Sequence, residues 1–187
     1  MNIIICGAGE VGLSLAKYLA AEDMQVTVID EDTERLQKIS ANIDVRTLVG
    51  KTYNPNILFD ANAADTDLLI SVTENDESNI LACEIAKIIF KVPRTMARIK
   101  EKELIEDKWA DLFSNEGFKV DNIISPEGEV AKMLARLVAV SGAHDLISFV
   151  DDRIRLIGVK LDEDCPVLET PLTQLTELFP DLKTKIV

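Results

Sequence analysis

Three glycines near the start of the chain, Gly7, Gly9 and Gly12, have the spacing of a phosphate-binding turn. An apolar run precedes them, a segment of helical periodicity follows, and a second apolar run ends at Asp30. In this context Gly7 permits the tight turn, Gly9 lets a pyrophosphate approach the backbone, and Gly12 lets helix and strand pack closely. The start of the helix offers unpaired N–H groups to the phosphates. The pattern predicts a dinucleotide site in which Asp30 accepts hydrogen bonds from both hydroxyls of an adenosine ribose.

The acidic residues that close this segment bear on which nucleotide binds. Asp30, Glu31 and Asp32 would repel the 2′-phosphate of NADP(H), and Arg35 is the only cation nearby. The sequence therefore favours NAD(H) over NADP(H). The alternative is a strand–helix–strand unit that packs tightly and binds no nucleotide.

The elements that must position these residues follow from the alternation of apolar runs with helix-periodic segments. Residues 1–140 are predicted to form an α/β domain with a doubly wound, parallel, six-stranded Rossmann-like sheet. The predicted strands lie within residues 2–6, 26–29, 45–49, 67–72, 95–99 and 118–124. In residues 141–187 the pattern changes to strands at 146–150 and 154–159, a short helix at 171–178 and an opening strand at 183–187. Because so short a segment is thin for its own core, we expect the start of a small α+β C-terminal subdomain, either truncated or completed by another chain.

Further polar residues fall at the carboxyl edge of the predicted sheet. Thr73 and Glu74 follow the fourth strand, and in open parallel sheets that edge faces the ligand crevice. Arg98 lies near the end of the fifth strand, where it is either a solvated or ion-paired surface residue or a cation that reaches a phosphate or a neighbouring subunit. The single tryptophan, Trp109, lies in a helix-like segment and is expected to pack in the core.

Composition narrows the class of protein. The net charge of −13 argues against binding to nucleic acid and against direct adhesion to an anionic membrane. Neither a leader peptide nor a membrane-spanning apolar run is evident, so we expect a soluble cytoplasmic chain without direct lipid insertion. The three cysteines lack CxxC spacing, and Cys6 and Cys83 are predicted to be buried, reduced thiols.

Catalytic groups are not evident. The single histidine, His144, follows the predicted sheet domain and is expected to be a surface or linker residue. The sequence shows no Tyr-xxx-Lys, GxSxG or HExxH motif, and no cluster with the spacing of zinc ligands. A nucleotide site without catalytic equipment indicates a sensor, not an enzyme. The alternatives are a small NAD-dependent oxidoreductase with unrecognised catalytic residues and an S-adenosylmethionine methyltransferase, which also uses a glycine turn and a strand-two acid.

The chain resembles the RCK family, also called KTN, which regulates potassium conductance. The resemblance rests on the glycine turn, on the strand end Val28-Ile29-Asp30 and on a more specific block, Val72-Thr73-Glu74-Asn75-Asp76-Glu77-Ser78-Asn79. The segments 97–99 and 124–127 extend it, so that it covers the predicted sheet domain nearly from end to end. The match is strongest to the first half of the family's peripheral NAD-binding subunits of bacterial potassium-uptake systems.

This resemblance implies roles for individual residues. The pyrophosphate would lie on a turn formed by Gly7, Ala8, Gly9, Glu10 and Val11. Asp30 would hold the adenosine ribose, Thr73 and Glu74 would line the crevice, and Arg98 would approach the nucleotide or a subunit junction. One departure is that many family members carry Gly-Asp-x-Thr or Gly-Asp-x-Ser after the third strand. Here Lys51 replaces that acid with a base, which would alter the preferred nucleotide or phosphate count.

The resemblance also implies a regulatory subunit without catalysis. Its ligand would be NAD(H), with ATP or ADP as alternatives, and its partner a membrane-embedded potassium transporter. The chain would form a homo-oligomer, a dimer or a tetrameric ring, at the inner face of the cell membrane, held there by the transporter. Nucleotide binding would favour one ring geometry over another and so gate potassium uptake, which requires only different affinities for the two states.

Overall fold

The structure is a computed structural model that describes residues 1–113, 117–139, 143–149 and 153–161, together with residues 165, 168, 170, 171 and 174. Contacts within the chain divide it into two compact units, residues 1–128 and 129–187. The domain boundary predicted after residue 140 stays a prediction.

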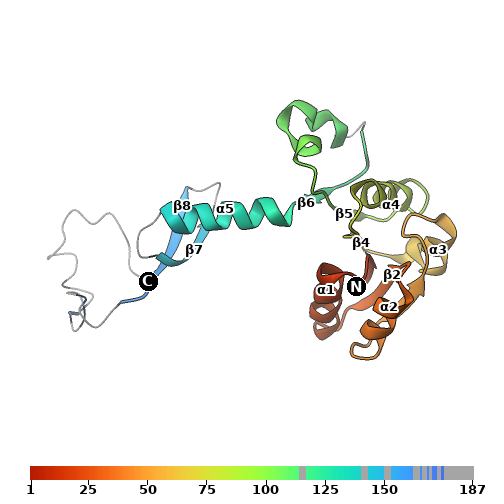
Figure 1. The fold of residues 1–187 in the computed structure, drawn as a ribbon, viewed down its shortest axis with the longest axis horizontal. Helices are drawn as coiled ribbons and strands as arrows, with labels where there is room; N and C mark the ends of the chain where they lie inside the picture. Colours follow the sequence, from red (N-terminus) through yellow and green to blue (C-terminus); the bar gives the residue numbers. More distant parts are fainter. Residues whose placement is uncertain are drawn as a thin grey trace. The chain divides into compact units, whose positions relative to one another are not determined.

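The first unit is built on a six-stranded parallel sheet in the order β3-β2-β1-β4-β5-β6 (Figure 1). Its strands are β1 (Asn2–Cys6), β2 (Gln25–Asp30), β3 (Arg46–Val49), β4 (Leu68–Ser71), β5 (Arg94–Arg98) and β6 (Asn122–Ile124). The predicted doubly wound, Rossmann-like sheet is therefore confirmed. The strand order reverses between β1 and β4, and in such sheets ligands bind outside the carboxyl ends of the strands at this point.

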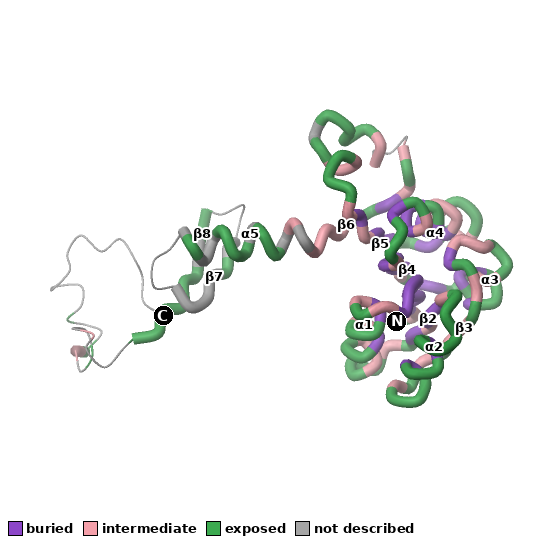
Figure 2. Tube along the Cα trace, viewed as in Figure 1, coloured by how far each residue is buried: buried purple, intermediate pink, exposed green. Residues whose placement is uncertain are grey.

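Helices cover both faces of the sheet. On one face lie α1 (Glu10–Ala21) and α2 (Thr33–Ser40), and on the other lie α3 (Pro55–Asp60) and α4 (Asp76–Ile88) (Figure 1). In β1, Ile3 and Ile5 pack toward α1 and α2, whereas Ile4 and Cys6 pack toward α3 and α4. Because both faces are buried, β1 is a continuous apolar run without polar alternation. Figure 2 shows the resulting concentration of buried residues along the central strands.

The segment between β5 and β6 differs from its prediction. It contains two 3₁₀ helices, η2 (Lys102–Ile105) and η3 (Asp107–Phe113), and another, η1 (Ala63–Asp65), precedes β4. Trp109 is 50% exposed, so the prediction that it packs in the core was wrong. A 3₁₀ helix spaces its side chains differently from an α-helix, and here Phe113 reaches the core while Trp109 lies in solvent with the Lys108 ammonium 5.7 Å from its ring centre.

The helix α5 (Pro126–Ala139) begins at the predicted proline. In the second unit, β7 (Ala143–Phe149) pairs antiparallel with β8 (Ile154–Val159), which confirms the two predicted strands. His144 lies within β7, so it is not a linker residue. The helix predicted at 171–178, apart from two isolated positions, and the strand predicted at 183–187 lie outside the described residues. No helix in the described part of the chain is long and apolar enough to cross a bilayer.

Candidate functional site

The protein itself requires two of the three glycines in the turn between β1 and α1. Gly7 has a φ of +111°, and a Cβ placed on it would lie 3.0 Å from the Thr73 nitrogen. On Gly12 a Cβ would lie 1.9 Å from the Gly7 carbonyl oxygen. Side chains at these positions would strain the backbone or force it apart, which agrees with the predicted roles in turning and packing.

Gly9 is different, because nothing in the described protein requires it to be glycine. Its φ of −69° is accessible to any residue, and a Cβ there would meet no described atom within 4 Å. It is also the N-cap of α1, which receives no side-chain cap. The neighbouring helices α2, α3 and α4 are capped by the side chains of Asp32, Asn54 and Asn75. The amino end of α1 thus presents backbone N–H groups beside open space, which is the arrangement that binds phosphates.

Asp30 lies at the end of β2, as predicted, and it has a second task that the sequence did not reveal. Its Oδ2 accepts a hydrogen bond from the Ala8 N–H at 2.5 Å, and its Oδ1 accepts one from the Asp32 N–H at 2.8 Å. The carboxylate therefore ties the glycine turn to β2. Each carboxylate oxygen has a further lone pair, so Asp30 can still accept hydrogen bonds from ribose hydroxyls.

Two hollows open at this carboxyl edge of the sheet, and together they include every predicted binding residue. The Tyr53 hollow, of about 220 Å³, is lined by Gly7, Gly9, Asp30, Glu31, Arg35, Thr52, Tyr53, Val72, Thr73, Glu74, Asn75 and Ser78. The Arg98 hollow, of about 430 Å³, is lined by Ala8, Gly9, Glu10, Val11, Leu13, Arg35, Lys38, Ile39, Val72, Glu74 and Arg98. Gly9, Arg35, Val72 and Glu74 border both. A third hollow, of about 470 Å³, lies at the opposite edge, by the amino ends of β1 and β2, away from the point where the strand order reverses.

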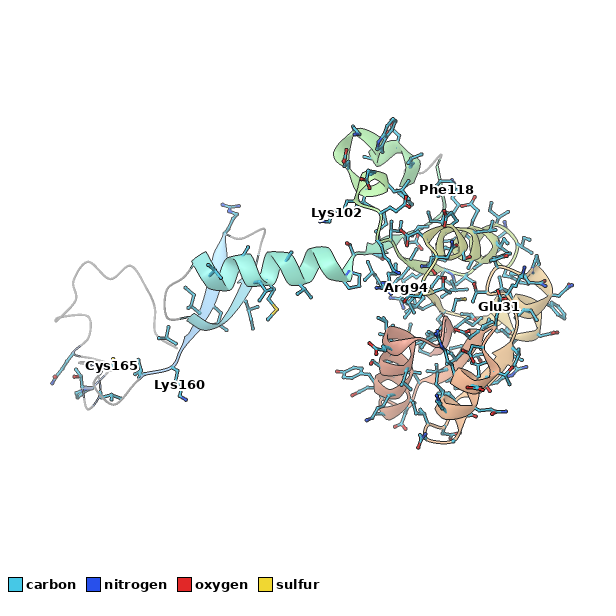
Figure 3. The ribbon with its side chains drawn as sticks, in the orientation of Figure 1. Glu31, Arg94, Lys102, Phe118, Lys160 and Cys165 are labelled. Atoms are coloured by element: carbon cyan, nitrogen blue, oxygen red, sulfur yellow. The ribbon has the colours of Figure 1, made fainter. Side chains whose placement is uncertain are left out.

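The two hollows differ in charge. Acids dominate the lining of the Tyr53 hollow, and Arg35 is the single cation among the described lining residues. One of the acids is Glu31, which directly follows β2 and is labelled in Figure 3. The Arg98 hollow has three cations, Arg35, Lys38 and Arg98, against two acids, Glu10 and Glu74. Carboxylates suit the hydroxyl donors of a sugar, and cations suit phosphates.

Sequence reasoning missed several of these lining residues. Thr52 and Tyr53 follow β3, so their position after a parallel strand could have indicated them. The Lys51 ammonium lies 5.9 Å from the centre of the Tyr53 ring. Lys38 stands one helical turn after Arg35 on α2, and that spacing was the available signal for its place in the Arg98 hollow.

A buried asparagine fixes the edge of the site between β4 and β5. Asn79 is fully buried, and its Oδ1 accepts hydrogen bonds from the Ser71 hydroxyl at 3.0 Å and the Thr73 N–H at 2.8 Å. Its amide Nδ2 donates to the carbonyl oxygens of Thr73 at 3.1 Å and Arg98 at 2.9 Å. Asn79 thereby holds together the ends of both strands and sets the position of Thr73 in the Tyr53 hollow.

Charged residues form a cluster at the ends of β4 and β5. Arg98 Nη1 lies 3.3 Å from Glu74 Oε1, and the Lys100 ammonium contacts Glu74 Oε2. Lys100 Nζ also donates to the Glu74 carbonyl oxygen at 3.1 Å. Hydrogen bonding and charge from Lys100, and then the charge of Arg98, lower the pKa of Glu74. Arg98 is therefore ion-paired, one of the alternatives that the sequence left open, and Lys100 is a partner that the sequence did not indicate.

Asp76, at the start of α4, joins this helix to the segment after β5. Its Oδ2 accepts hydrogen bonds from the backbone N–H groups of Lys100 at 2.8 Å and Glu101 at 2.9 Å. Two polar residues of the specific sequence block after β4 therefore have structural tasks, since Asn79 holds the end of β5 and Asp76 holds the segment that follows it.

Comparisons with known proteins identify a family and several relatives that this chain resembles. A family model, the TrkA-N domain, matches residues 3–126. The chain is 41% identical over 187 residues to the Trk system potassium uptake protein TrkA of Azorhizobium caulinodans, covering 100% of this chain and 41% of that protein. It is 36% identical over 186 residues to the protein of the same name from Vibrio alginolyticus, covering 100% and 40%. The chain thus spans about two fifths of the length of these relatives.

Solved structures share the fold at lower identity. The TrkA-N domain of the inner membrane protein ybaL from Escherichia coli matches with a TM-score of 0.63 and 20% identity, covering 73% of this chain and 96% of that one. The GsuK channel bound to NAD matches with a TM-score of 0.60 and 13% identity, covering 80% and 25%. GsuK bound to ADP matches with a TM-score of 0.57 and 20% identity, covering 73% and 33%. At these identities the likeness shows the Rossmann-like fold alone.

Proposed function

This chain belongs to the TrkA-N domain family, and we propose that it is the nucleotide-sensing part of a regulatory subunit of a potassium transporter. The predicted family resemblance is confirmed by the family model and by relatives that match over the whole chain. Because the chain spans about two fifths of those relatives, its potassium transport, its partners and its place in the cell are inferred from them.

The observation that carries nucleotide binding is Gly9. It borders two hollows of different charge, at the start of α1, which has no side-chain cap, and a Cβ there would meet no described atom within 4 Å. No described contact within the protein requires glycine at this position, whereas the absence of a side chain leaves the backbone N–H groups accessible to a ligand.

The ligand that fits these residues best is NAD(H), with ADP or ATP as alternatives. The turn formed by Gly7, Ala8, Gly9, Glu10 and Val11 would hold the phosphates. Asp30 would accept hydrogen bonds from the adenosine ribose, and Thr73, Glu74 and Arg98 would line the rest of the crevice. Structural neighbours of this chain are bound to NAD and to ADP, which supports the class of ligand. Glu31 in the Tyr53 hollow adds to the repulsion of a 2′-phosphate.

The proposed mechanism is binding without catalysis. The subunit forms a homo-oligomer, a dimer or a tetrameric ring, on the cytoplasmic side of a membrane-embedded potassium transporter. The nucleotide binds one arrangement of the ring more tightly than the other, and a differential of about 1–3 kcal/mol is typical of such coupling. The transporter holds the subunit at the membrane, so the acidic chain needs no direct contact with lipid.

Calorimetric titration of the chain with NADH, NAD, ATP and ADP tests the proposal. We expect at least one of them to bind, NADP to bind more weakly than NAD, and 2′,3′-dideoxy-ATP to bind more weakly than ATP. The dideoxy nucleotide removes the two hydroxyls without altering the protein, which is cleaner than replacing Asp30 because that carboxylate also holds Ala8. If none of the four nucleotides binds at millimolar concentration, the proposal is wrong.

The same chain can be used to test the two competing functions, an oxidoreductase and a methyltransferase. An oxidoreductase would change the NADH absorbance band when a substrate is supplied, and a methyltransferase would bind S-adenosylmethionine in the titration. We expect neither result, since the proposed roles of the site residues are to contact phosphates and a sugar, and the proposed effect of the nucleotide comes from binding alone.

A further inference from the structure

Glu74 is paired with Arg98, a cation that lines one of the two hollows. Its carboxylate is paired with Arg98 at 3.3 Å and also contacts Lys100, and it borders both the Tyr53 hollow and the Arg98 hollow. Both hollows include Gly9, where the phosphates are proposed to lie. A ligand phosphate at this turn and the Glu74 carboxylate are therefore rival partners for the same guanidinium.

The two members of the Arg98–Glu74 pair differ in how firmly they are held. The Arg98 side chain is 11% exposed, and its backbone carbonyl oxygen accepts a hydrogen bond from the buried Asn79. The Glu74 side chain is 73% exposed. An exposed carboxylate is readily rehydrated when it leaves its partner, whereas moving a mostly buried guanidinium out of its place is costly. Of the two, Glu74 is the one that can move away.

We propose that Glu74 is an internal competitor for the ligand's phosphate. In the chain without nucleotide its carboxylate neutralises Arg98 and Lys100, and on binding a phosphate group takes its place at Arg98. This inference rests on the proposed function, which it deepens by naming the residue that sets the nucleotide concentration at which the site fills. The exchange is favourable because a phosphate group offers more anionic oxygens to a guanidinium than a carboxylate does.

The competition has a chemical signature. It raises the concentration at which phosphate-bearing nucleotides bind, and it leaves adenosine, which has no phosphate, unaffected. ADP and ATP are therefore the informative ligands and adenosine is the reference ligand. Since the ion pairs are near the surface, the effect decreases as salt screens them.

The test is calorimetric titration of the wild-type chain and of Glu74→Gln with ATP, ADP and adenosine at low ionic strength. Glutamine keeps the size of the side chain and removes its charge. We expect Glu74→Gln to bind ATP and ADP about two- to fivefold more tightly, the range that surface ion pairs typically span, with no change for adenosine. Glu77→Gln is the matched control, because Glu77 is exposed, lies in the first turn of α4 three residues after Glu74, and lines neither hollow.

Several results would overturn the inference. Weaker binding of ATP by Glu74→Gln would mean that Glu74 holds the ligand, and equal tightening by Glu77→Gln would mean that only net charge matters. Unchanged affinity in Glu74→Gln would mean that no exchange occurs. In the background of Arg98→Gln the gain from Glu74→Gln should vanish, and its persistence would also contradict the exchange. Failure of every variant and the wild type to bind any nucleotide would instead refute the proposed function.

Discussion

Replacing Gly9 by alanine tests whether glycine is needed at this position for ligand binding or for the stability of the fold. At the N-cap, alanine is less favourable than glycine by about 0.5–1 kcal/mol. Alanine also restricts the unfolded chain, which stabilises the protein by about 0.4–1 kcal/mol where the backbone conformation is ordinary, as it is here with a φ of −69°. Because the new methyl group would meet no described atom within 4 Å, nothing is added to this balance. The free energy of unfolding should change by less than about 0.5 kcal/mol.

Nucleotide binding should respond very differently to Gly9→Ala. The methyl group would stand at the amino end of α1, between the two hollows. A phosphate held away from even one N–H donor loses a charge-assisted hydrogen bond, which costs about 1.5–3 kcal/mol, or roughly 10- to 150-fold in affinity.

Gly12→Ala is the matched control. Its Cβ would lie 1.9 Å from the Gly7 carbonyl oxygen, so the turn and α1 must move apart. Overpacking of this kind costs about 1–3 kcal/mol, and contact with a rigid backbone atom places the expected loss at the upper end, only partly offset by the better helix propensity of alanine.

Urea unfolding of both variants followed by titration with NAD and ATP decides the question. Gly9→Ala should unfold like the wild type and bind poorly, whereas Gly12→Ala should unfold earlier. A Gly9→Ala chain that binds both nucleotides as tightly as the wild type would show that no phosphate approaches this residue. A loss of more than about 2 kcal/mol in its stability would show that Gly9 serves the fold.

Three further predictions concern the surrounding structure. Asn79→Leu should lower the free energy of unfolding, measured in urea, by at least about 3 kcal/mol. Several partners of Asn79 would lose a hydrogen bond, and each loss costs about 1–3 kcal/mol. A loss under about 1 kcal/mol would contradict the role of Asn79 in joining the ends of β4 and β5. Burial raises the pKa of Cys6 to about 12, so a thiol reagent at pH 8 should label only the partly exposed Cys165 in the folded chain and all three cysteines in denaturant. Burial opposes ionisation of Asp121, but hydrogen bonding, first from Lys87, outweighs it and lowers the pKa. The stability that Asp121→Asn removes at pH 6 should therefore fade as the pH falls below the ordinary value of 3.8, and a constant difference down to pH 2 would refute it.

The parts of the site that could be predicted are those in which a short stretch of sequence determines its own geometry. The glycine spacing and the acid at the end of β2 belong to one strand–turn–helix–strand unit, so Gly7, Gly9, Gly12 and Asp30 could be placed without knowing the rest of the fold. The six strands were likewise indicated by their apolar runs, since burial on both faces removes polar residues from them.

The parts that could not be predicted depend on which strands become neighbours. Lys100 is a partner of Glu74 only because β5 lies beside β4, and that pairing brings together residues 26 positions apart. Lys38 lines the Arg98 hollow only because α2 packs on the same face of the sheet as α1. The prediction that Trp109 packs in the core was wrong for a different reason. The spacing of the apolar residues in this segment fits an α-helix as well as the 3₁₀ helix that forms.

The site divides into residues that the fold requires and residues that it does not. Gly7, Gly12 and Asn79 are fixed by backbone contacts, which join the glycine turn to the end of β4 and that end to β5. Gly9 and the exposed carboxylate of Glu74 are not fixed in this way, and both border the two hollows. A ligand phosphate at this edge can act through the charged group that it displaces, which requires no deformation of the sheet. Glu74, at the junction between β4 and α4, is an exposed group of this kind, and its release would change the charge presented beside α4 without moving the sheet.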